Sequence, residues 1–327
     1  MLNNYGIGGK RVWAVAGGKG GTGKTVISAN IGIGLASLNH RVILVDADLG
    51  GPNLHTCLNI KRPNFTLNDF LNKKVPDLDS ILLDTPNNNL KLISGGTEIL
   101  GLANIQYQKK LKLIRHLEKL DAEFIIVDLG AGTSFNTIDF FNLSNEGILI
   151  CNPEPNAKLD TYSFLKNVVW RKMSEITRNN GILKEVISRT NYVQENKVFE
   201  VSKLLELIKN EDEECFNTLE KVLKNFRPKL IMNKIRRKSQ IAEAYQLVSL
   251  AKDYLRVDVE YVGHIDVDQH VIDATEKLMP FFLKYPTCDA SKNLFDVIKN
   301  LIASQEREEK SFRRFKKDMK IESQQWE

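Results

Sequence analysis

The feature that most constrains the fold is the glycine-rich segment GGKGGTGKT at residues 17–25. It follows the apolar run RVWAVA, residues 11–16, and precedes the helix-like segment TVISANIGIGLASL, residues 25–38. Glycine adopts backbone conformations that other residues avoid, so a stretch this rich in glycine predicts a tight loop. The sequence therefore predicts a strand, a glycine loop and a helix in direct succession.

Short runs rich in β-branched residues recur along the chain, separated by longer helix-like segments. Continuous apolar runs of this kind are typical of strands that are covered on both faces. We therefore expect an α/β fold, with a mostly parallel twisted sheet and helices on both of its faces. The expected strands are residues 11–16, 41–46, 90–94, 123–128, 146–151 and 228–233.

The composition indicates the cellular location of the protein more clearly than its function. A net charge of +5 permits a nucleic acid or an anionic membrane as partner but favours neither. The four cysteines are widely scattered with no metal-ligand spacing, which indicates reduced thiols in a cytosolic protein. The first ten residues lack the apolar core of a signal peptide, and no run is long enough to cross a membrane. We expect a cytoplasmic protein, at most peripheral on a membrane.

The glycine loop has the spacing of a phosphate-binding loop. Residues 18–25 match G-x-x-x-x-G-K-[ST], and they stand between the expected strand and helix as such a loop requires. Successive backbone N–H groups and the start of the helix would form an anion site. Lys24 would reach the β- and γ-phosphates, and the Thr25 hydroxyl would bind Mg²⁺. The plain alternative is a glycine-rich turn that only closes a strand–helix unit.

The second lysine of the loop is the more specific signal. KGGTGKT, residues 19–25, resembles the deviant Walker A motif of the MinD/ParA family of dimerising ATPases. The resemblance implies that Lys19 crosses an ATP-dependent homodimer interface to the partner's nucleotide, where a cation would stabilise the transferring phosphoryl group. The alternative for Lys19 is a solvated loop lysine. By the same resemblance, the nucleotide would contact Gly20, Gly21, Thr22, Gly23, Lys24, Thr25 and Val26. Many relatives carry a second hydroxyl residue where Val26 stands.

Two acidic segments extend the resemblance. RVILVDADLGGPNLH, residues 41–55, resembles the family's switch I, in which Asp48 would position the attacking water and Asp46 would support the water shell of Mg²⁺. A strand-terminating turn is the alternative interpretation of this segment. EFIIVDLGAGTSFNT, residues 123–137, resembles the Walker B and switch II segment, in which Asp128 would hold Mg²⁺ through water.

Two further positions complete the expected site. The Gly132 backbone would approach the γ-phosphate. The family often has a proline in this turn, where this chain has Leu129-Gly130. PKLIMNK, residues 228–234, places Asn233 at the family position that recognises adenine, because an amide donates and accepts at once. A turn asparagine is the alternative. VEYVGHIDVDQHVIDA, residues 259–274, resembles the family's last strand and the loop that flanks the base.

The resemblance implies the organisation of the chain. We expect one P-loop ATPase domain over residues 1–303, in which residues 156–227, rich in lysine and glutamate, form a helical insertion between two core strands. The acidic run EDEE, residues 211–214, is most simply a solvated face, with a partner-docking surface as the alternative.

We expect residues 304–327 to form a basic amphipathic tail, in which Phe312, Phe315 and Met319 would share a stripe at helical spacing. Contact with an anionic membrane, packing on the protein or a partner, and a solvated tail all remain open.

Two classes of function share this chemistry. DLGGPNLH and NPEPNA, residues 152–157, are most similar to the flagellar-placement branch, FlhG/FleN, and imply a switch that positions or assembles a cellular structure. Such a switch would hydrolyse ATP slowly until a protein partner stimulates it. A ParA-like ATPase that partitions DNA is the alternative within this class, although nucleic acid is not favoured. A metabolic ATP-dependent enzyme or an iron–sulfur carrier is the other class, and the carrier lacks the paired cysteines it would need.

Overall fold

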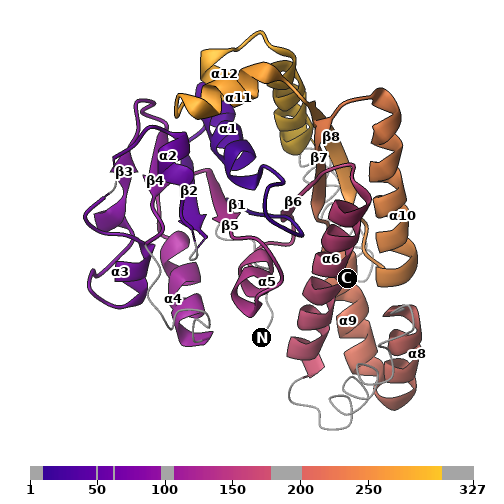
Figure 1. Ribbon diagram of the computed structural model, residues 1–327. Coiled ribbons are helices and arrows are strands. Elements are labelled where there is room, and N and C mark those ends of the chain that lie inside the picture. The colour runs from indigo at the N-terminus through magenta and orange to yellow at the C-terminus, as the bar shows by residue number, and fades with distance from the viewer. Residues whose placement is uncertain (1–9, 49–50, 62, 97–106, 178–200, 304–327) are drawn as a thin grey trace, which may run out of the picture.

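The computed structural model describes residues 10–48, 51–61, 63–96, 107–177 and 201–303. Within these ranges an eight-stranded sheet runs in the order β3-β4-β2-β5-β1-β6-β7-β8 (Figure 1). All neighbouring strands are parallel except β3 and β4, so the expected α/β class is confirmed. The strands are β1 (Arg11–Ala16), β2 (Val42–Ala47), β3 (Leu83–Asp84), β4 (Leu90–Ile93), β5 (Phe124–Leu129), β6 (Ile148–Cys151), β7 (Lys229–Ile235) and β8 (Glu260–Asp266).

Helices cover both faces of the sheet (Figure 1). They are α1 (Lys24–Ser37), α2 (Leu54–Cys57), α3 (Leu67–Leu71), α4 (Tyr107–Leu117), α5 (Phe135–Phe141), α6 (Pro155–Ile176), α8 (Val201–Glu211), α9 (Glu213–Asn225), α10 (Ala242–Leu255), α11 (Gln269–Glu276) and α12 (Phe281–Lys284). A last helix follows over residues 289–303. Short 3₁₀ turns occupy Asp79–Ile81 and Lys238–Ile241.

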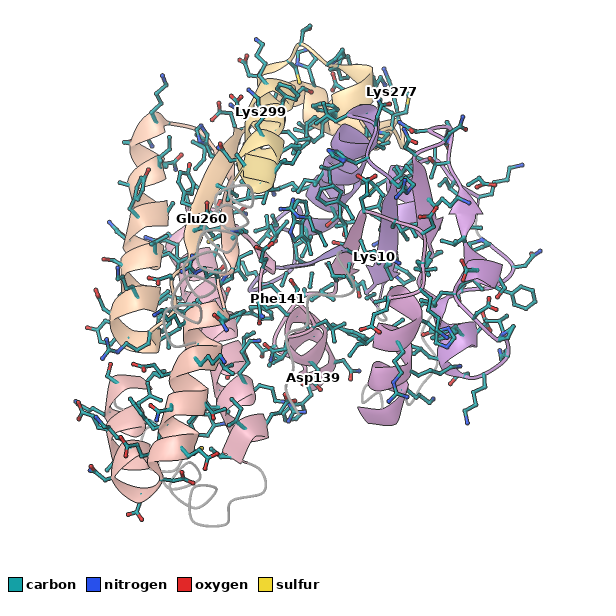
Figure 2. All side chains as sticks on the ribbon, turned by 180° about the vertical axis from the view of Figure 1, so that it is seen from behind. Lys10, Asp139, Phe141, Glu260, Lys277 and Lys299 are labelled. Atoms are coloured by element: carbon teal, nitrogen blue, oxygen red, sulfur yellow. The ribbon has the colours of Figure 1, made fainter. Side chains whose placement is uncertain are left out.

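The alternation of side chains along the strands divides the core into two layers. In β1, Val12 and Ala14 belong to the layer beneath α4, α5, α6 and α10, whereas Trp13 and Val15 face α1 and the last helix. Figure 2 shows the side chains on the ribbon, with Phe141 inside the fold and Lys277 and Lys299 at its surface. Each face of the sheet is therefore buried, as the continuous apolar runs predicted.

The structure differs from the sequence expectation at one edge of the sheet. The two-residue strand β3 pairs antiparallel with β4, Leu83 opposite Leu92. Only one of its residues is apolar, so it gave no run that periodicity could detect.

The described part of residues 156–227 consists of α6, α8 and α9, which lie between β6 and β7 in the chain. Leu219 and Leu223 of α9 are buried in the layer that also contains Val168 of α6. The acidic run has a local structural role, because Asp212 caps α9 by accepting a hydrogen bond from the Cys215 N–H at 2.9 Å. Glu213 and Glu214 then lie in the first turn of α9, where acidic residues favour the helix dipole.

No helix among the described residues combines the length and the apolar character that crossing a membrane requires.

A buried lysine in α6 makes the stability of this layer depend on pH. Lys172 is 8% exposed, its ammonium lies 4.6 Å from the centre of the Phe226 ring, and burial lowers its pKa to about 8. Between that value and its ordinary value of 10.5, the unfolded chain binds more protons than the folded one, so stability rises with pH.

We therefore expect Lys172→Met to raise the free energy of unfolding at pH 7 by roughly 1–3 kcal/mol. Urea titrations from about pH 7 to pH 10 should show wild-type stability rising toward that of the variant. A constant difference between the two proteins over this range would contradict the assignment.

Candidate nucleotide-binding site

The glycine loop joins β1 to α1 as the sequence predicts. Gly21 and Gly23 have φ of 80° and 91°, and Gly23 is the residue before the first turn of α1. A Cβ atom at Gly23 would lie 2.4 Å from Nδ2 of Asn233, whereas one at Gly20 or Gly21 would meet nothing within 4 Å. The loop is thus pressed against β7 on one side and open on the other, as a backbone cradle for an anion requires.

Side chains from the end of β7 hold the loop in place. Asn233, 8% exposed, donates a hydrogen bond from Nδ2 to the Thr22 carbonyl at 2.7 Å. The Lys234 ammonium donates to the Gly21 carbonyl at 2.8 Å. Both bonds use carbonyls, which leaves the backbone N–H groups of Gly21 and Thr22 for another acceptor. The sequence analysis did not name Lys234 as a site residue, although its position directly after Asn233 at a strand end could have identified it.

Two carboxylates meet at the ends of neighbouring strands. Asp46 of β2 is directly opposite Asp128 of β5, and Asp128 is opposite Val15 of β1. The side chains of Asp46 and Asp128 are 0% and 1% exposed. The parallel register therefore brings together residues that are 82 positions apart in the sequence.

Burial raises the pKa values of both carboxyl groups. Desolvation, and then the charge of Asp128, raise the pKa of Asp46 to about 7, against hydrogen bonds from the N–H groups of Leu54 and Asp48. Desolvation likewise raises the pKa of Asp128 to about 6, against hydroxyl donors and the charge of Lys24. A cation beside the pair would remove much of this cost.

The two oxygens of the Asp128 carboxylate have different surroundings. Oδ1 accepts a hydrogen bond from the Ser28 hydroxyl at 2.8 Å, whereas Oδ2 is buried with no hydrogen-bond partner among the described residues. The Thr22 hydroxyl oxygen is also buried with no hydrogen-bond partner among the described residues. Thr25, three residues before Ser28 in α1, contributes a hydroxyl that also lowers the pKa of Asp128. An oxygen-rich site with an unpaired buried carboxylate oxygen fits a hard divalent cation such as Mg²⁺.

Ser28 is a second site residue that the sequence analysis missed. It lies on the same face of α1 as Thr25, one helical turn further along, so helical spacing could have identified it.

The two loop lysines occupy different environments. Lys24 is 7% exposed, its ammonium donates to the Lys19 carbonyl at 3.3 Å, and burial lowers its pKa while Asp128 and Asp48 oppose this shift. The Lys19 side chain is 51% exposed, and its ammonium lies 3.9 Å from a carboxylate oxygen of Asp160 in α6. Lys24 therefore lies inside the site and Lys19 at the surface of the protomer.

Asp48 lies between the two segments that resemble switches. Its Oδ1 accepts a hydrogen bond from the Gly51 N–H at 3.2 Å. A Cβ atom at Gly130 would lie 2.8 Å from the same oxygen. Any residue larger than glycine would displace Asp48, which gives a physical reason for the departure from the family's proline at this turn. Gly132, two residues on, has φ of 90° and open space beside it.

The remaining expected residues are placed as follows. Val26 of α1 is partly buried against the apolar layer on this face of the sheet, so it packs as an apolar residue and offers no hydroxyl to a nucleotide. Phe312, Phe315 and Met319 lie outside the described residues.

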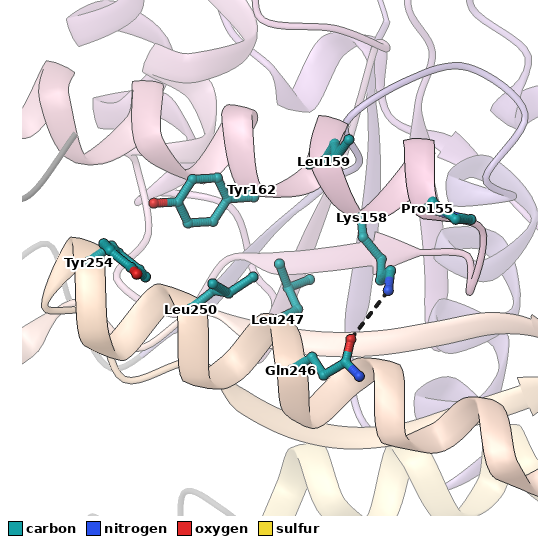
Figure 3. Close-up of a pocket in the computed structure, with 8 residues that line it drawn as sticks. All are labelled: Pro155, Lys158, Leu159, Tyr162, Gln246, Leu247, Leu250 and Tyr254. Atoms are coloured by element: carbon teal, nitrogen blue, oxygen red, sulfur yellow. Dashed lines mark hydrogen bonds between the residues drawn. The ribbon is translucent and has the colours of Figure 1, made fainter. Parts of the chain in front are cut away.

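A separate cavity of about 450 Å³ lies between α6 and α10 (Figure 3). Its lining includes Leu159, Tyr162, Leu250 and Tyr254, and the Lys158 ammonium donates to Gln246 at 3.4 Å across one end. None of the residues that line it comes from the glycine loop or from the ends of β2 and β5. The cavity is therefore separate from the site at the glycine loop and the two carboxylates.

The family assignment follows from comparison with known families. Residues 13–281 match the CobQ/CobB/MinD/ParA nucleotide binding domain. The chain belongs to this family. The match covers the glycine loop, both acidic strand ends and Asn233, which are the residues that the site brings together.

Individual relatives agree with this assignment. The antiactivator FleN of Pseudomonas aeruginosa is 31% identical over 157 residues, which are 48% of this chain and 55% of FleN. The septum site-determining protein MinD of Buchnera aphidicola from Acyrthosiphon pisum is 29% identical over 207 residues, 61% of this chain and 74% of that protein. The chain thus matches little more than half of the length of FleN.

A solved structure of MinD from Pyrococcus horikoshii with Mg-ADP has a TM-score of 0.61 and 20% identity, and the match covers 89% of this chain and 96% of that one. At this identity the likeness shows the fold.

The buried carboxylate pair predicts a pH dependence of stability for the protein without nucleotide or divalent cation. Because folding raises the pKa values of Asp46 and Asp128 from 3.8 to about 7 and about 6, the folded state binds more protons than the unfolded state between these values. Stability contributed by this pair is therefore lost as pH rises from about 4 to about 7.

Replacing Asp46 with Asn should raise the free energy of unfolding at pH 8, on the order of 3 kcal/mol, and the gain should vanish near pH 4. Chemical denaturation in the presence of a chelator, for wild type and variant side by side, measures this difference. A gain that does not change with pH would contradict the raised pKa values.

Proposed function

We propose that the protein is an ATP-hydrolysing switch that homodimerises around Mg-ATP to control the positioning or assembly of a cellular structure. The observation that carries the proposal is the pair of loop lysines, one buried beside the carboxylates and the other at the surface of the protomer. Membership of the nucleotide-binding family and the relatives FleN and MinD support it.

The residues of the site have distinct roles in this proposal. The N–H groups of residues 20–25 and the ammonium of Lys24 bind the phosphates, and the Asn233 amide recognises adenine while it also holds the loop. Thr25 and Asp128 hold Mg²⁺, with Asp46 supporting its water shell, and the ion neutralises charge that develops on the phosphates. Asp48, at the junction with Gly130, orients the attacking water.

Lys19 completes the site from a second copy of the chain. Its contact with Asp160 is a long ion pair between two exposed side chains, which contributes little to stability. Leaving that contact therefore costs little, and the gain on reaching the partner's phosphates is larger because the partner site is shielded from water. Hydrolysis removes the charge that Lys19 binds, so the dimer dissolves.

The cellular role follows the relatives. FleN is named an antiactivator and MinD determines septum sites, and a structure from Aquifex aeolicus contains MinD in complex with MinC. By analogy the switch acts on a protein partner that stimulates a slow intrinsic hydrolysis. In this proposal the protein works in the cytoplasm, or at the inner face of the membrane through its tail.

Three variants test the switch. Lys24→Ala should weaken ATP binding by roughly ten- to a hundredfold, because a charge-assisted contact is lost. Lys19→Ala should leave nucleotide binding within about threefold but slow hydrolysis by roughly a hundredfold or more and prevent dimerisation. Asp48→Ala should bind ATP, fail to hydrolyse it and accumulate as a dimer.

Lys252→Ala is the matched control, because Lys252 is also an exposed lysine with a long ion pair, 3.8 Å from Asp258. Nucleotide binding by calorimetry, phosphate release and multi-angle light scattering provide the measurements. A monomeric Asp48→Ala protein in saturating Mg-ATP, or equal loss of nucleotide binding in the Lys19 and Lys24 variants, would overturn the proposal.

A further inference from the structure

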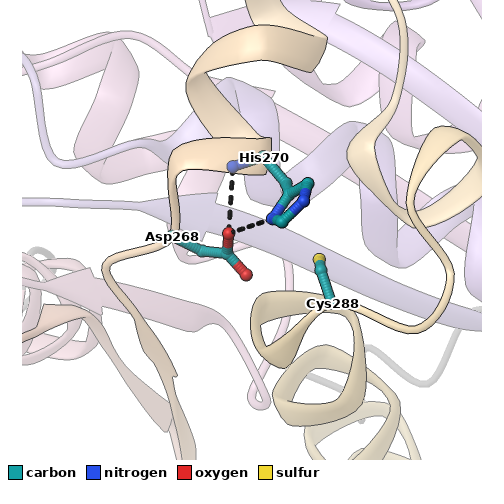
Figure 4. A group of neighbouring side chains, drawn as sticks. All are labelled: Asp268, His270 and Cys288. Atoms are coloured by element: carbon teal, nitrogen blue, oxygen red, sulfur yellow. Dashed lines mark hydrogen bonds and ion pairs between the residues drawn. The ribbon is translucent and has the colours of Figure 1, made fainter.

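A second cluster of ligand-type side chains lies on the layer formed with α1, at the turn between β8 and α11. Asp268 precedes α11, His270 lies in its first turn, and Cys288 comes directly before the last helix (Figure 4). One ligand atom from each of the three residues lies within 4.8 Å of the other two. The spacing of these residues in the sequence matches no metal motif, so only the fold brings them together.

Backbone hydrogen bonds fix the carboxylate at the centre of the cluster. Oδ1 of Asp268 accepts from the His270 N–H at 2.9 Å, and Oδ2 accepts from the Ala290 N–H at 3.1 Å. Asp268 thereby caps α11 and the last helix together. These two backbone bonds hold the carboxylate in place.

Two ligand-type side chains lie beside this carboxylate. The Nδ1 atom of His270 lies 2.7 Å from Oδ1 (Figure 4). The Cys288 sulfur lies within 4.8 Å of both ligand atoms, and its thiol donates to the Ser291 hydroxyl at 3.3 Å. A helix cap needs only backbone N–H groups, so neither the imidazole nor the thiol is required for capping. An imidazole nitrogen, a sulfur and a carboxylate oxygen around one point are instead the donor set of a zinc site.

We propose that Asp268, His270 and Cys288 bind one Zn²⁺ ion. Binding releases the proton of the Cys288 thiol, whereas the neutral imidazole of His270 coordinates through Nδ1 and keeps its N–H proton on Nε2. The thiol gives up its hydrogen bond to the Ser291 hydroxyl, while both backbone bonds to Asp268 remain. The charges of Zn²⁺, the carboxylate and the thiolate cancel, and water fills the fourth position on the side where the His270 side chain is 51% exposed.

The donor set separates this site from the magnesium site at the glycine loop. Thiolate and imidazole ligands select Zn²⁺ and related transition metals, whereas Mg²⁺ prefers oxygen ligands. The two sites therefore differ in metal, and a test of one in excess Mg²⁺ does not depend on the other.

Zinc would connect two segments that the fold already brings together. The Asp266 N–H donates to Asn293 of the last helix at 3.0 Å, the Ala290 N–H of that helix donates to Asp268 at 3.1 Å, and the metal would add a further link between residues 268 and 288. β8 pairs with β7, with Ile265 opposite Asn233, so the linked loop follows the strand beside the predicted adenine position. The ion is structural in this account, and its expected effect is a stiffer carboxyl-terminal edge of the sheet.

Cobalt(II) is the probe, because it takes the place of Zn²⁺ and a cobalt–thiolate bond absorbs in the near ultraviolet. Full-length protein without a histidine tag is titrated with Co²⁺ in excess Mg²⁺ and without nucleotide. We expect a thiolate charge-transfer band that saturates at one equivalent and disappears when Zn²⁺ is added.

Cys288→Ser and His270→Ala should weaken Co²⁺ binding by at least ~10–100-fold, the range that follows loss of a supporting partner of a metal ligand. The matched controls are Cys215→Ser, which replaces another half-buried cysteine, and His264→Ala, and both should bind Co²⁺ as the wild type does.

A second measurement needs no variant. Zn²⁺ should protect Cys288, and not Cys57 or Cys215, from alkylation of the folded wild-type protein, as followed by mass spectrometry. Absence of the charge-transfer band, a band that survives Cys288→Ser, or equal alkylation of Cys288 with and without Zn²⁺ would each overturn the proposal.

Discussion

The placement of Asp46 directly opposite Asp128 is the constraint on which the rest of the site depends. Parallel pairing of β2 with β5 brings two carboxylates to one edge of the sheet and buries both. Burial and mutual repulsion oppose the ionisation of both carboxyl groups. The doubly ionised pair is therefore unfavourable unless a cation or a proton binds beside it. The ionised carboxylate pair is therefore unfavourable at the same edge of the sheet at which the backbone of the glycine loop forms an anion site.

The loop and the carboxylates form one unit because neighbouring elements hold both. Asn233 and Lys234 of β7 bind the carbonyl oxygens of Thr22 and Gly21. Ser28 of α1 binds Asp128, and Asp48 rests against Gly130. A change in occupancy of the phosphate site would thus act on the ends of β2, β5 and β7 together. This arrangement gives the proposed switch a structural route from nucleotide to protein surface.

The sequence predicted the strands and the carboxylates for a clear physical reason. Buried parallel strands appear as apolar runs, and a polar residue at the end of such a run is conspicuous, as with Asp46 and Asp128. The edge strand β3 was missed because two residues carry no period. Ser28 and Lys234 stand beside predicted site residues, one turn after Thr25 and directly after Asn233, but their contacts with Asp128 and with the Gly21 carbonyl appear only in the fold. The cluster of Asp268 with Cys288 depends on a turn between helices, which no spacing rule describes.

The central claim is that Asp46 and Asp128 are a buried pair whose pKa values stay raised until a cation binds beside them. Carbon-13 NMR titration of aspartate carboxyl groups, assigned with Asp46→Asn and Asp128→Asn, measures this most directly. Without nucleotide and divalent cation, we predict two carboxyl groups titrating with pKa values of about 7 and about 6. Both values should fall below the measured range when Mg-ATP is added. Two carboxyl groups that titrate near 3.8, the ordinary value, in both samples would contradict the account.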